Sequence, residues 1–72
     1  MTEHYTGLEF RWGILSTGGI ATAFARDLTY LNNHVVGAVG SRNLQSAKDW
    51  AIEFPGCRAH GSYEDLVHDP EI

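Results

Sequence analysis

The feature that most constrains the fold is a pair of adjacent glycines, Gly18 and Gly19, at the junction of two differently patterned segments. The stretch RWGILSTGGIATAF, residues 11–24, begins with the apolar pattern of a β-strand and continues with the pattern of a helix. A strand, a glycine turn and a helix in this order are typical of the opening of a βαβ unit. We therefore expect a strand at residues 11–15, a turn at the two glycines and a helix from Ile20 onward.

The residues after the turn support this helix. Four apolar residues recur at helical spacing and would form one apolar stripe: Ile20, Phe24, Leu28 and Leu31. Ala21 and Ala25 flank the stripe and would let the helix lie close to a sheet. The segment NNH at residues 32–34 contains residues that tolerate a left-handed turn, so it is expected to end the helix.

The rest of the chain repeats this alternation. VVGAV at residues 35–39 is apolar on both faces, like a strand that is covered on both sides. A second helix is expected at residues 44–54, where Pro55-Gly56 ends it. Its apolar face would consist of Leu44, Ala47, Ala51 and Phe54. Residues 57–60 predict a short third strand, and Ser62 is expected to cap a third short helix that ends before Pro70.

The order βαβαβα predicts an α/β fold, the N-terminal half of a doubly wound parallel sheet (a Rossmann βαβαβα unit) with strand order 3-2-1. The pattern calls for a fourth strand beside residues 11–15, and the sequence ends at Ile72 before reaching it. We expect a loose leader at residues 1–10 and a partial dinucleotide-binding domain at residues 11–72. The unit is thus expected to be incomplete at its C-terminus and to be a fragment of a longer protein.

Composition excludes several classes of function. The chain is 43% hydrophobic with a net charge of −4, which is typical of globular proteins and disfavours nucleic acid as a partner. The uncharged run at residues 12–25 is too short to span a membrane. A signal peptide is disfavoured because Glu3 and Glu9, and no Lys or Arg, precede Arg11. Cys57 is the single cysteine, which favours a reducing, cytoplasmic location.

The glycine turn predicts an anion site. The first N–H groups of a helix lack intrahelical partners, and glycine lets a pyrophosphate approach them. The dinucleotide fingerprint G-x-G-x-x-G/A is matched by Gly18 at the close-approach position and Ala21 at the packing position, whereas Ser16 replaces the first glycine. Serine suits this position if the backbone does not require a positive φ. The alternative is a turn whose glycines serve packing alone.

The end of the second predicted strand bears on the choice of cofactor. An NAD site has an acidic residue there for the ribose 2′-hydroxyl, but this chain has Ser41-Arg42. A hydroxyl and a guanidinium suit a 2′-phosphate, so these residues favour NADP over NAD. The alternative is that Ser41 merely caps the next helix.

Three blocks together carry a family resemblance: RWGILSTGGIATAFARDL, VVGAVGSRNLQSAKDWA and AHGSYEDLVHDPEI. In this order they resemble the opening of the Gfo/Idh/MocA oxidoreductases, most closely the branch with dimeric dihydrodiol dehydrogenases and NADP-dependent D-xylose dehydrogenases. The resemblance implies a Rossmann domain followed by an α/β substrate domain. It also implies reversible hydride transfer between NADP(H) and a hydroxyl carbon of a sugar or cyclic diol, and it leaves a homo-oligomer open.

The resemblance assigns cofactor-binding residues and no catalytic ones. Five residues would bind the pyrophosphate: Ser16, Thr17, Gly18, Gly19 and Ile20. Ser41 and Arg42 would bind the adenosine 2′-phosphate. The family's catalytic lysine belongs to a Glu-Lys-Pro segment that this sequence lacks, and Lys48, its single lysine, lies on the second predicted helix. The 72 residues alone are therefore expected to be inactive.

Two alternatives to the oxidoreductase stay open: a stand-alone nucleotide-binding module without catalysis, and a methyltransferase of similar topology. The second is disfavoured because such enzymes place an acid at the end of the second strand.

Other chemistry-bearing residues have structural interpretations. Four histidines lack metal-ligand spacing and are expected at surfaces or turns: His4, His34, His60 and His68. We also expect a buried, unreactive thiol at Cys57, and core or sheet-covering positions for Trp12 and Trp50. A solvated acidic face is expected from Glu64, Asp65 and Asp69. No metal site is predicted.

Overall fold

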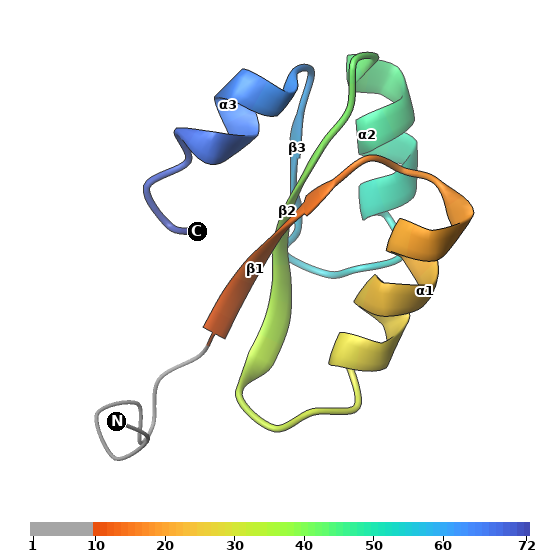
Figure 1. The fold of residues 1–72 in the computed structure, drawn as a ribbon, viewed down its shortest axis with the longest axis vertical. Coiled ribbons are helices and arrows are strands. Elements are labelled where there is room, and N and C mark those ends of the chain that lie inside the picture. Colours follow the sequence, from red (N-terminus) through yellow and green to blue (C-terminus); the bar gives the residue numbers. More distant parts are fainter. Residues whose placement is uncertain (1–9) are drawn as a thin grey trace.

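The computed structural model describes residues 10–72. Strands and helices alternate along this part of the chain: β1 (Phe10–Leu15), α1 (Gly19–Leu28), β2 (His34–Gly40), α2 (Leu44–Ala51), β3 (Arg58–His60) and α3 (Tyr63–Val67). Figure 1 shows these elements in space. The predicted order βαβαβα is confirmed.

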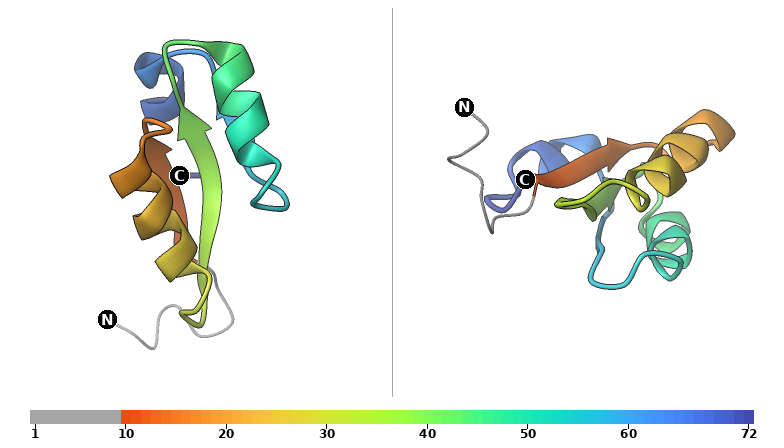
Figure 2. Two further views of the ribbon diagram at one scale, coloured as in Figure 1. Left: turned by 90° about the vertical axis from the view of Figure 1, so that its right-hand side faces the viewer. Right: turned by 90° about the horizontal axis from the view of Figure 1, so that it is seen from below.

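The strands form a three-stranded parallel sheet in the order β1-β2-β3. Helices α1 and α2 cover one face of this sheet and α3 covers the other (Figures 1 and 2). The structure is therefore an α/β unit with helices on both faces, arranged as in the N-terminal half of a Rossmann-like fold. The expected strand order is confirmed. Among the described strands, β1 pairs with β2 alone.

The core lies between the sheet and the pair α1 and α2. Its buried members come from both layers: Ile14, Ala25, Leu28, Val36, Val39, Ala47 and Phe54. On the opposite face, Leu66 of α3 packs directly over β2. A Cβ atom built on Gly40 would lie 2.9 Å from the Cβ atom of Leu66, so α3 can approach the strand this closely only because residue 40 is glycine.

The prediction that the apolar stripe of α1 forms its buried face is wrong. Of its four members, Leu28 is buried, whereas Ile20, Phe24 and Leu31 are 91%, 46% and 53% exposed. The helix instead contacts the sheet through its small residues: Ala25 is fully buried and Ala21 is partly buried. Small side chains let the helix axis come close to the sheet, which turns the bulkier neighbours outward.

The second helix also differs from expectation. It ends at Ala51 rather than at residue 54, and the chain continues in a tighter turn in which the N–H of Phe54 bonds the carbonyl of Ala51 at 3.0 Å. This turn still places Phe54 in the core. Leu44, expected on the buried face, is 45% exposed because it lies in the first turn of the helix, at the edge of the sheet.

Several other boundaries also differ from expectation. The first strand includes Phe10, which was assigned to the leader, and residues 1–9 and His4 lie outside the described residues. The second strand gains a residue at each end, and the third begins at Arg58 rather than at residue 57. The first helix ends at Leu28, before the expected stop at residues 32–34, and the N–H of Leu31 bonds the carbonyl of Leu28 at 3.1 Å in the turn that follows. Asn33 adopts the expected left-handed conformation with φ of 65°, whereas His34 already belongs to β2.

A cluster of charged side chains contradicts two expectations. The carboxylate of Asp69, predicted on a solvated acidic face, is almost fully buried and accepts hydrogen bonds from the Arg58 guanidinium and from the backbone N–H of Glu71. His60, expected at the surface, is half-buried with Nε2 2.9 Å from the same carboxylate. The Arg58 guanidinium holds the pKa of Asp69 well below its usual range, and the hydrogen bonds from the backbone N–H of Glu71 and from His60 lower this pKa further. The cluster fastens the segment after α3 to β3.

None of the helices within residues 10–72 is both long and apolar enough to cross a bilayer.

Candidate cofactor-binding site

The two predicted phosphate-binding segments lie side by side. In the register of the sheet Leu15 pairs with Gly40, and the N–H of Ser16 donates to the carbonyl of Gly40 over 2.8 Å. The N–H of Ser41 in turn donates to the carbonyl of His60 at 3.1 Å. The loops after β1 and β2 therefore emerge at one edge of the sheet, where the carboxyl ends of parallel strands meet and ligands of such folds bind.

The N-terminus of α1 has no cap from a side chain. Its N-cap residue is Gly18, with an extended backbone (φ −72°, ψ 173°), and no side chain accepts a hydrogen bond from the N–H groups of the first turn. Thr22 bonds the carbonyl of Gly18 through both its N–H and its hydroxyl, at 2.9 and 2.8 Å. No acidic residue lies in the first turn. The donors of this turn and the positive end of the helix dipole are thus available to an anion.

The glycines of the turn leave room at this end of α1. A Cβ atom at Gly19 would meet no other atom within 4 Å, and one at Gly18 would meet only the Ser16 hydroxyl at 3.4 Å. Neither residue has a positive φ. The fold itself therefore places no demand for glycine at Gly19, which disfavours the alternative that the glycines serve packing alone.

Serine was expected to suit position 16 if the backbone had no positive φ, but the structure does not meet this condition. Its φ is 88°, in the left-handed region that favours glycine. The Ser16 hydroxyl accepts a hydrogen bond from the N–H of Gly18 at 3.0 Å, which holds the turn in place of the missing glycine. This local bond offsets part of the backbone strain.

In the loop after β2, Ser41 does not cap the following helix. The cap of α2 is Asn43, whose side chain accepts from the N–H of Ser46 at 3.0 Å. The alternative that Ser41 caps this helix is therefore wrong. The Ser41 hydroxyl accepts from the N–H of Asn43 at 3.2 Å and keeps its own proton available as a donor.

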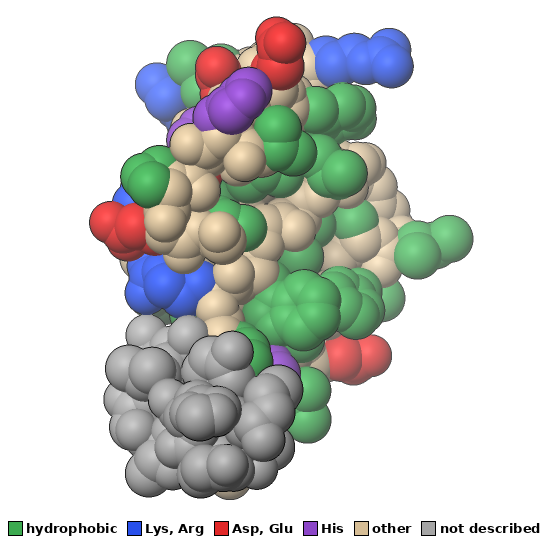
Figure 3. Space-filling model, turned by 60° about the vertical axis from the view of Figure 1, so that its left-hand side comes forward, with side chains coloured by type: hydrophobic (Ala, Val, Ile, Leu, Met, Phe, Trp, Pro, Cys, Tyr) green, Lys and Arg blue, Asp and Glu red, His purple; other side chains and the backbone are tan. Residues whose placement is uncertain are grey.

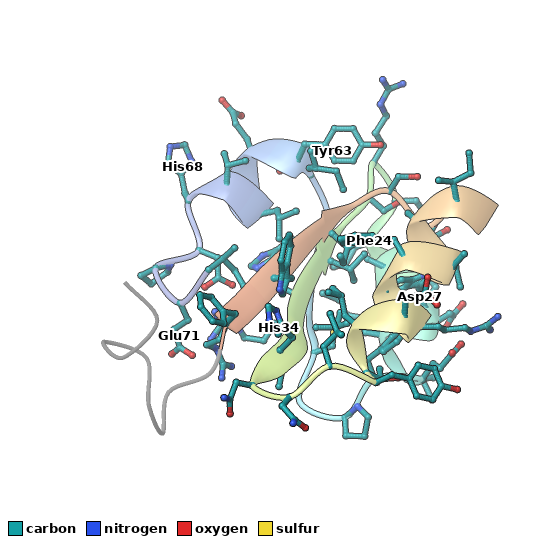
Figure 4. The ribbon with its side chains drawn as sticks, turned by 60° about the horizontal axis from the view of Figure 1, so that its bottom comes forward. Phe24, Asp27, His34, Tyr63, His68 and Glu71 are labelled. Carbon is teal, nitrogen blue, oxygen red and sulfur yellow. The ribbon has the colours of Figure 1, made fainter. Side chains whose placement is uncertain are left out.

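Arg42 is exposed and lies over an aromatic ring. Its guanidinium carbon is 5.9 Å from the centroid of the Tyr63 ring, at the start of α3. Figure 4 shows Tyr63 reaching from α3 toward the loop that follows β2. No local sequence pattern predicted this contact. The signal for it was the parallel topology, because residues that follow neighbouring strands meet at one edge of the sheet.

An apolar groove borders the glycine turn. It has a volume of about 720 Å³, and residues from the end of β1 and the start of α1 line it, including Trp12, Leu15, Ile20 and Phe24. The Trp12 ring meets the Phe24 ring edge-on at 5.5 Å, and its indole N–H donates to Nδ1 of His34 at 2.9 Å. Figure 3 shows the hydrophobic side chains that gather on this side of the molecule.

The other side chains considered for chemistry have structural roles. Trp50 is half-buried against Phe54, and its indole N–H donates to the Thr22 hydroxyl at 2.8 Å, which ties α2 to α1. Burial raises the pKa of the Cys57 thiol to about 11, so the thiol is unreactive near neutrality. Within residues 10–72, no cluster of His, Cys, Asp or Glu has the arrangement of a metal site.

Comparison with known proteins relates this geometry to a group of enzymes. The chain is 42% identical over 67 residues to trans-1,2-dihydrobenzene-1,2-diol dehydrogenase of Mus musculus. It is 40% identical over 67 residues to the human protein of that name and 44% identical over 64 residues to the Xenopus laevis protein. These relatives are dehydrogenases. No protein-family model matches the chain.

The match covers most of this chain but only a small part of each relative. It covers 90% of the chain for the mouse and human relatives and 86% for the frog relative. The chain spans about a fifth of the length of these relatives, since the match covers 20%, 20% and 19% of them. The similarity therefore concerns only this matched part of the dehydrogenase relatives.

Proposed function

We propose that these residues form the NADP(H)-binding portion of a Gfo/Idh/MocA-type oxidoreductase that transfers hydride to or from a hydroxyl carbon of a cyclic diol or sugar. The single observation that carries the proposal is the meeting of an uncapped helix N-terminus with Ser41 and Arg42 at one edge of the sheet. The similarity to proteins named dihydrodiol dehydrogenases supports the reaction and the substrate class.

Each proposed residue has a distinct part in binding. The first-turn N–H groups at Gly19 and Ile20 would donate to the pyrophosphate, and the loop residues Ser16, Thr17 and Gly18 would shape the turn around it. The Ser41 hydroxyl and the Arg42 guanidinium would bind the 2′-phosphate. The bound cofactor would supply or accept the hydride. The groups that move the proton of the substrate lie outside these 72 residues in this proposal.

The test is the charge reversal Arg42→Asp in the protein that carries these residues. It removes a charge-assisted bond and adds repulsion, so NADPH binding should weaken by about 100-fold, while NADH binding changes by less than about threefold. Isothermal titration calorimetry with both cofactors measures the two dissociation constants.

Lys48→Asp is the matched control, because it makes the same change in net charge on the exposed face of α2. It should leave the preference for NADPH intact. Equal losses of NADPH and NADH in Arg42→Asp would contradict the 2′-phosphate assignment. Tight binding of both cofactors without any dihydrodiol or sugar oxidation would instead favour a nucleotide-binding module.

A further inference from the structure

The Arg42 side chain has one described contact, the aromatic face of Tyr63. Its guanidinium forms no hydrogen bond and no ion pair with any residue in the described part of the chain. A long, exposed arginine without a fixed partner samples many rotamers, and ordering it on ligand binding costs free energy. The ring of Tyr63 is therefore the group that restricts where this guanidinium lies.

Tyr63 is itself held in place from two directions. It is the first residue of α3, directly after the N-cap Ser62, whose hydroxyl accepts from the N–H of Asp65 at 3.1 Å. The turn before it packs closely on the start of α2, since a Cβ atom at Gly61 would lie 3.1 Å from the Cβ atom of Leu44. These contacts fix the backbone of Tyr63, so its ring starts from a defined position beside the loop that carries Ser41 and Arg42.

From this geometry we infer that Tyr63 is a positioning residue that sets the preference for NADPH by holding the Arg42 guanidinium through a cation–π contact. This inference rests on the proposed function. The separation of 5.9 Å lies within the range in which a guanidinium is attracted to a ring face. The aromatic ring, and not the hydroxyl, is the part of Tyr63 that acts.

The experiment compares NADPH and NADH binding by calorimetry in three Tyr63 variants and one control variant of the protein that carries these residues. Tyr63→Leu should weaken NADPH binding about fivefold and leave NADH binding within about twofold, because the ring contact contributes little beyond this factor at an exposed site. Tyr63→Phe keeps the ring and should match the unmodified protein. Tyr63→Trp offers a stronger ring face and should retain or increase the preference for NADPH.

Tyr30→Leu is the matched control. Tyr30 is 85% exposed and follows the end of α1, and its loss should change neither dissociation constant. The thermal unfolding midpoint of each variant is recorded in parallel. If Tyr63→Leu fails to fold, Tyr63→Phe and Tyr63→Trp keep the inference falsifiable, because a loss of NADPH preference in both would assign the role to the hydroxyl and overturn the role of the ring.

A double-mutant cycle separates this inference from the proposed function. In an Arg42→Leu background, Tyr63→Leu should have no further effect on the ratio of the two dissociation constants. If Arg42→Leu abolishes the preference for NADPH and Tyr63→Leu alone leaves it unchanged, the role of Tyr63 is wrong and the proposed function stands. If the unmodified protein binds neither cofactor, or Arg42→Leu weakens both equally, the NADP assignment fails and the role of Tyr63 fails with it.

Discussion

The loops that precede α1 and α2 have the same beginning and different endings. In each, a serine two residues before the N-cap accepts a hydrogen bond from the N–H of that residue, at 3.0 Å for Ser16 and Gly18 and at 3.2 Å for Ser41 and Asn43. Asn43 then caps α2 with its side chain, whereas Gly18 has no side chain and α1 stays uncapped.

This difference separates a structural helix start from one suited to an anion. A cap satisfies a backbone donor within the protein and stabilises the helix. Glycine at the same position forgoes that stabilisation and leaves the donors and the space above them to a ligand. At the N-cap position the two loops differ by one residue type, Gly18 before α1 and Asn43 before α2, so exchanging these residues tests the difference directly.

The largest effect is expected from Gly18→Asn, which transfers the cap of α2 to α1. The backbone of Gly18 is extended, so asparagine fits it without strain. Cofactor binding should weaken by about 3 kcal/mol, roughly 100-fold, for NADPH and NADH alike, because the amide side chain occupies the pyrophosphate position. The free energy of unfolding should rise by a few tenths of a kcal/mol. Undiminished binding of both cofactors would refute the pyrophosphate site at α1.

The next effect concerns the buried carboxylate of Asp69, which fastens the segment after α3 to β3. The native pKa of Asp69 is lowered, so its unfolded carboxylate takes up a proton first as the pH falls. The stability that Asp69 contributes is therefore complete above about pH 5 and decreases progressively below it. Asp69→Asn should be less stable than the unmodified chain at pH 7 and should lose less stability between about pH 5 and pH 2.

Urea unfolding followed by circular dichroism across that pH range measures this difference. Glu64→Gln removes an exposed carboxylate from α3 and serves as the control, with the acid profile of the unmodified chain. Parallel pH profiles for Asp69→Asn and the unmodified chain would show that the cluster around Asp69 does not anchor the segment after α3.

A smaller effect is expected from Asn43→Ala, which removes the cap of α2. The free energy of unfolding should fall by about 1 kcal/mol, whereas the corresponding change at α1, Gly18→Ala, should alter it by less, since no capping bond is lost there. Chemical denaturation of the two variants checks the difference. Equal losses would mean that the two helix starts do not differ in the way the comparison requires.

Effects of similar or smaller size are expected at Ser16, the serine of the α1 loop. Ser16→Ala keeps the positive φ and loses the bond to the N–H of Gly18, so it should destabilise the chain by about 1 kcal/mol. Ser16→Gly loses the same bond but removes the strain of the left-handed backbone, so its stability should stay within about 0.5 kcal/mol of the unmodified chain. Denaturant unfolding distinguishes the two. A loss in Ser16→Gly as large as the loss in Ser16→Ala would show that relief of the left-handed backbone at residue 16 contributes nothing.

Much of the fold was predictable because local patterns coincide with it. The apolar β2, the glycine turn and the breakers after α2 gave the order of elements and the strand order of the sheet. The buried face of α1 was not predictable in this way. Periodicity marks which residues share a face, but the close approach through Ala25 depends on the sheet beneath the helix, so Ile20 and Phe24 ended up outside.

The candidate site was likewise predictable from the sequence only in part. The glycine turn and Ser41-Arg42 are adjacent in sequence to the ends of predicted strands, and a parallel sheet brings such ends together. Asn43 as the cap of α2, the positive φ of Ser16 and the ring beneath Arg42 required the backbone path of each loop.

The sequence by itself determined the alternation of strands and helices and pointed to the residues that we propose to bind a dinucleotide, because both depend on neighbours within a few positions. Only the tertiary structure decided which face of α1 is buried and that Asp69 lies in a buried cluster with Arg58 and His60. These outcomes depend on contacts between β3, α3 and the segment after it, or between α1 and the sheet. Such contacts form between residues far apart in the chain, where burial and hydrogen bonding override local preference.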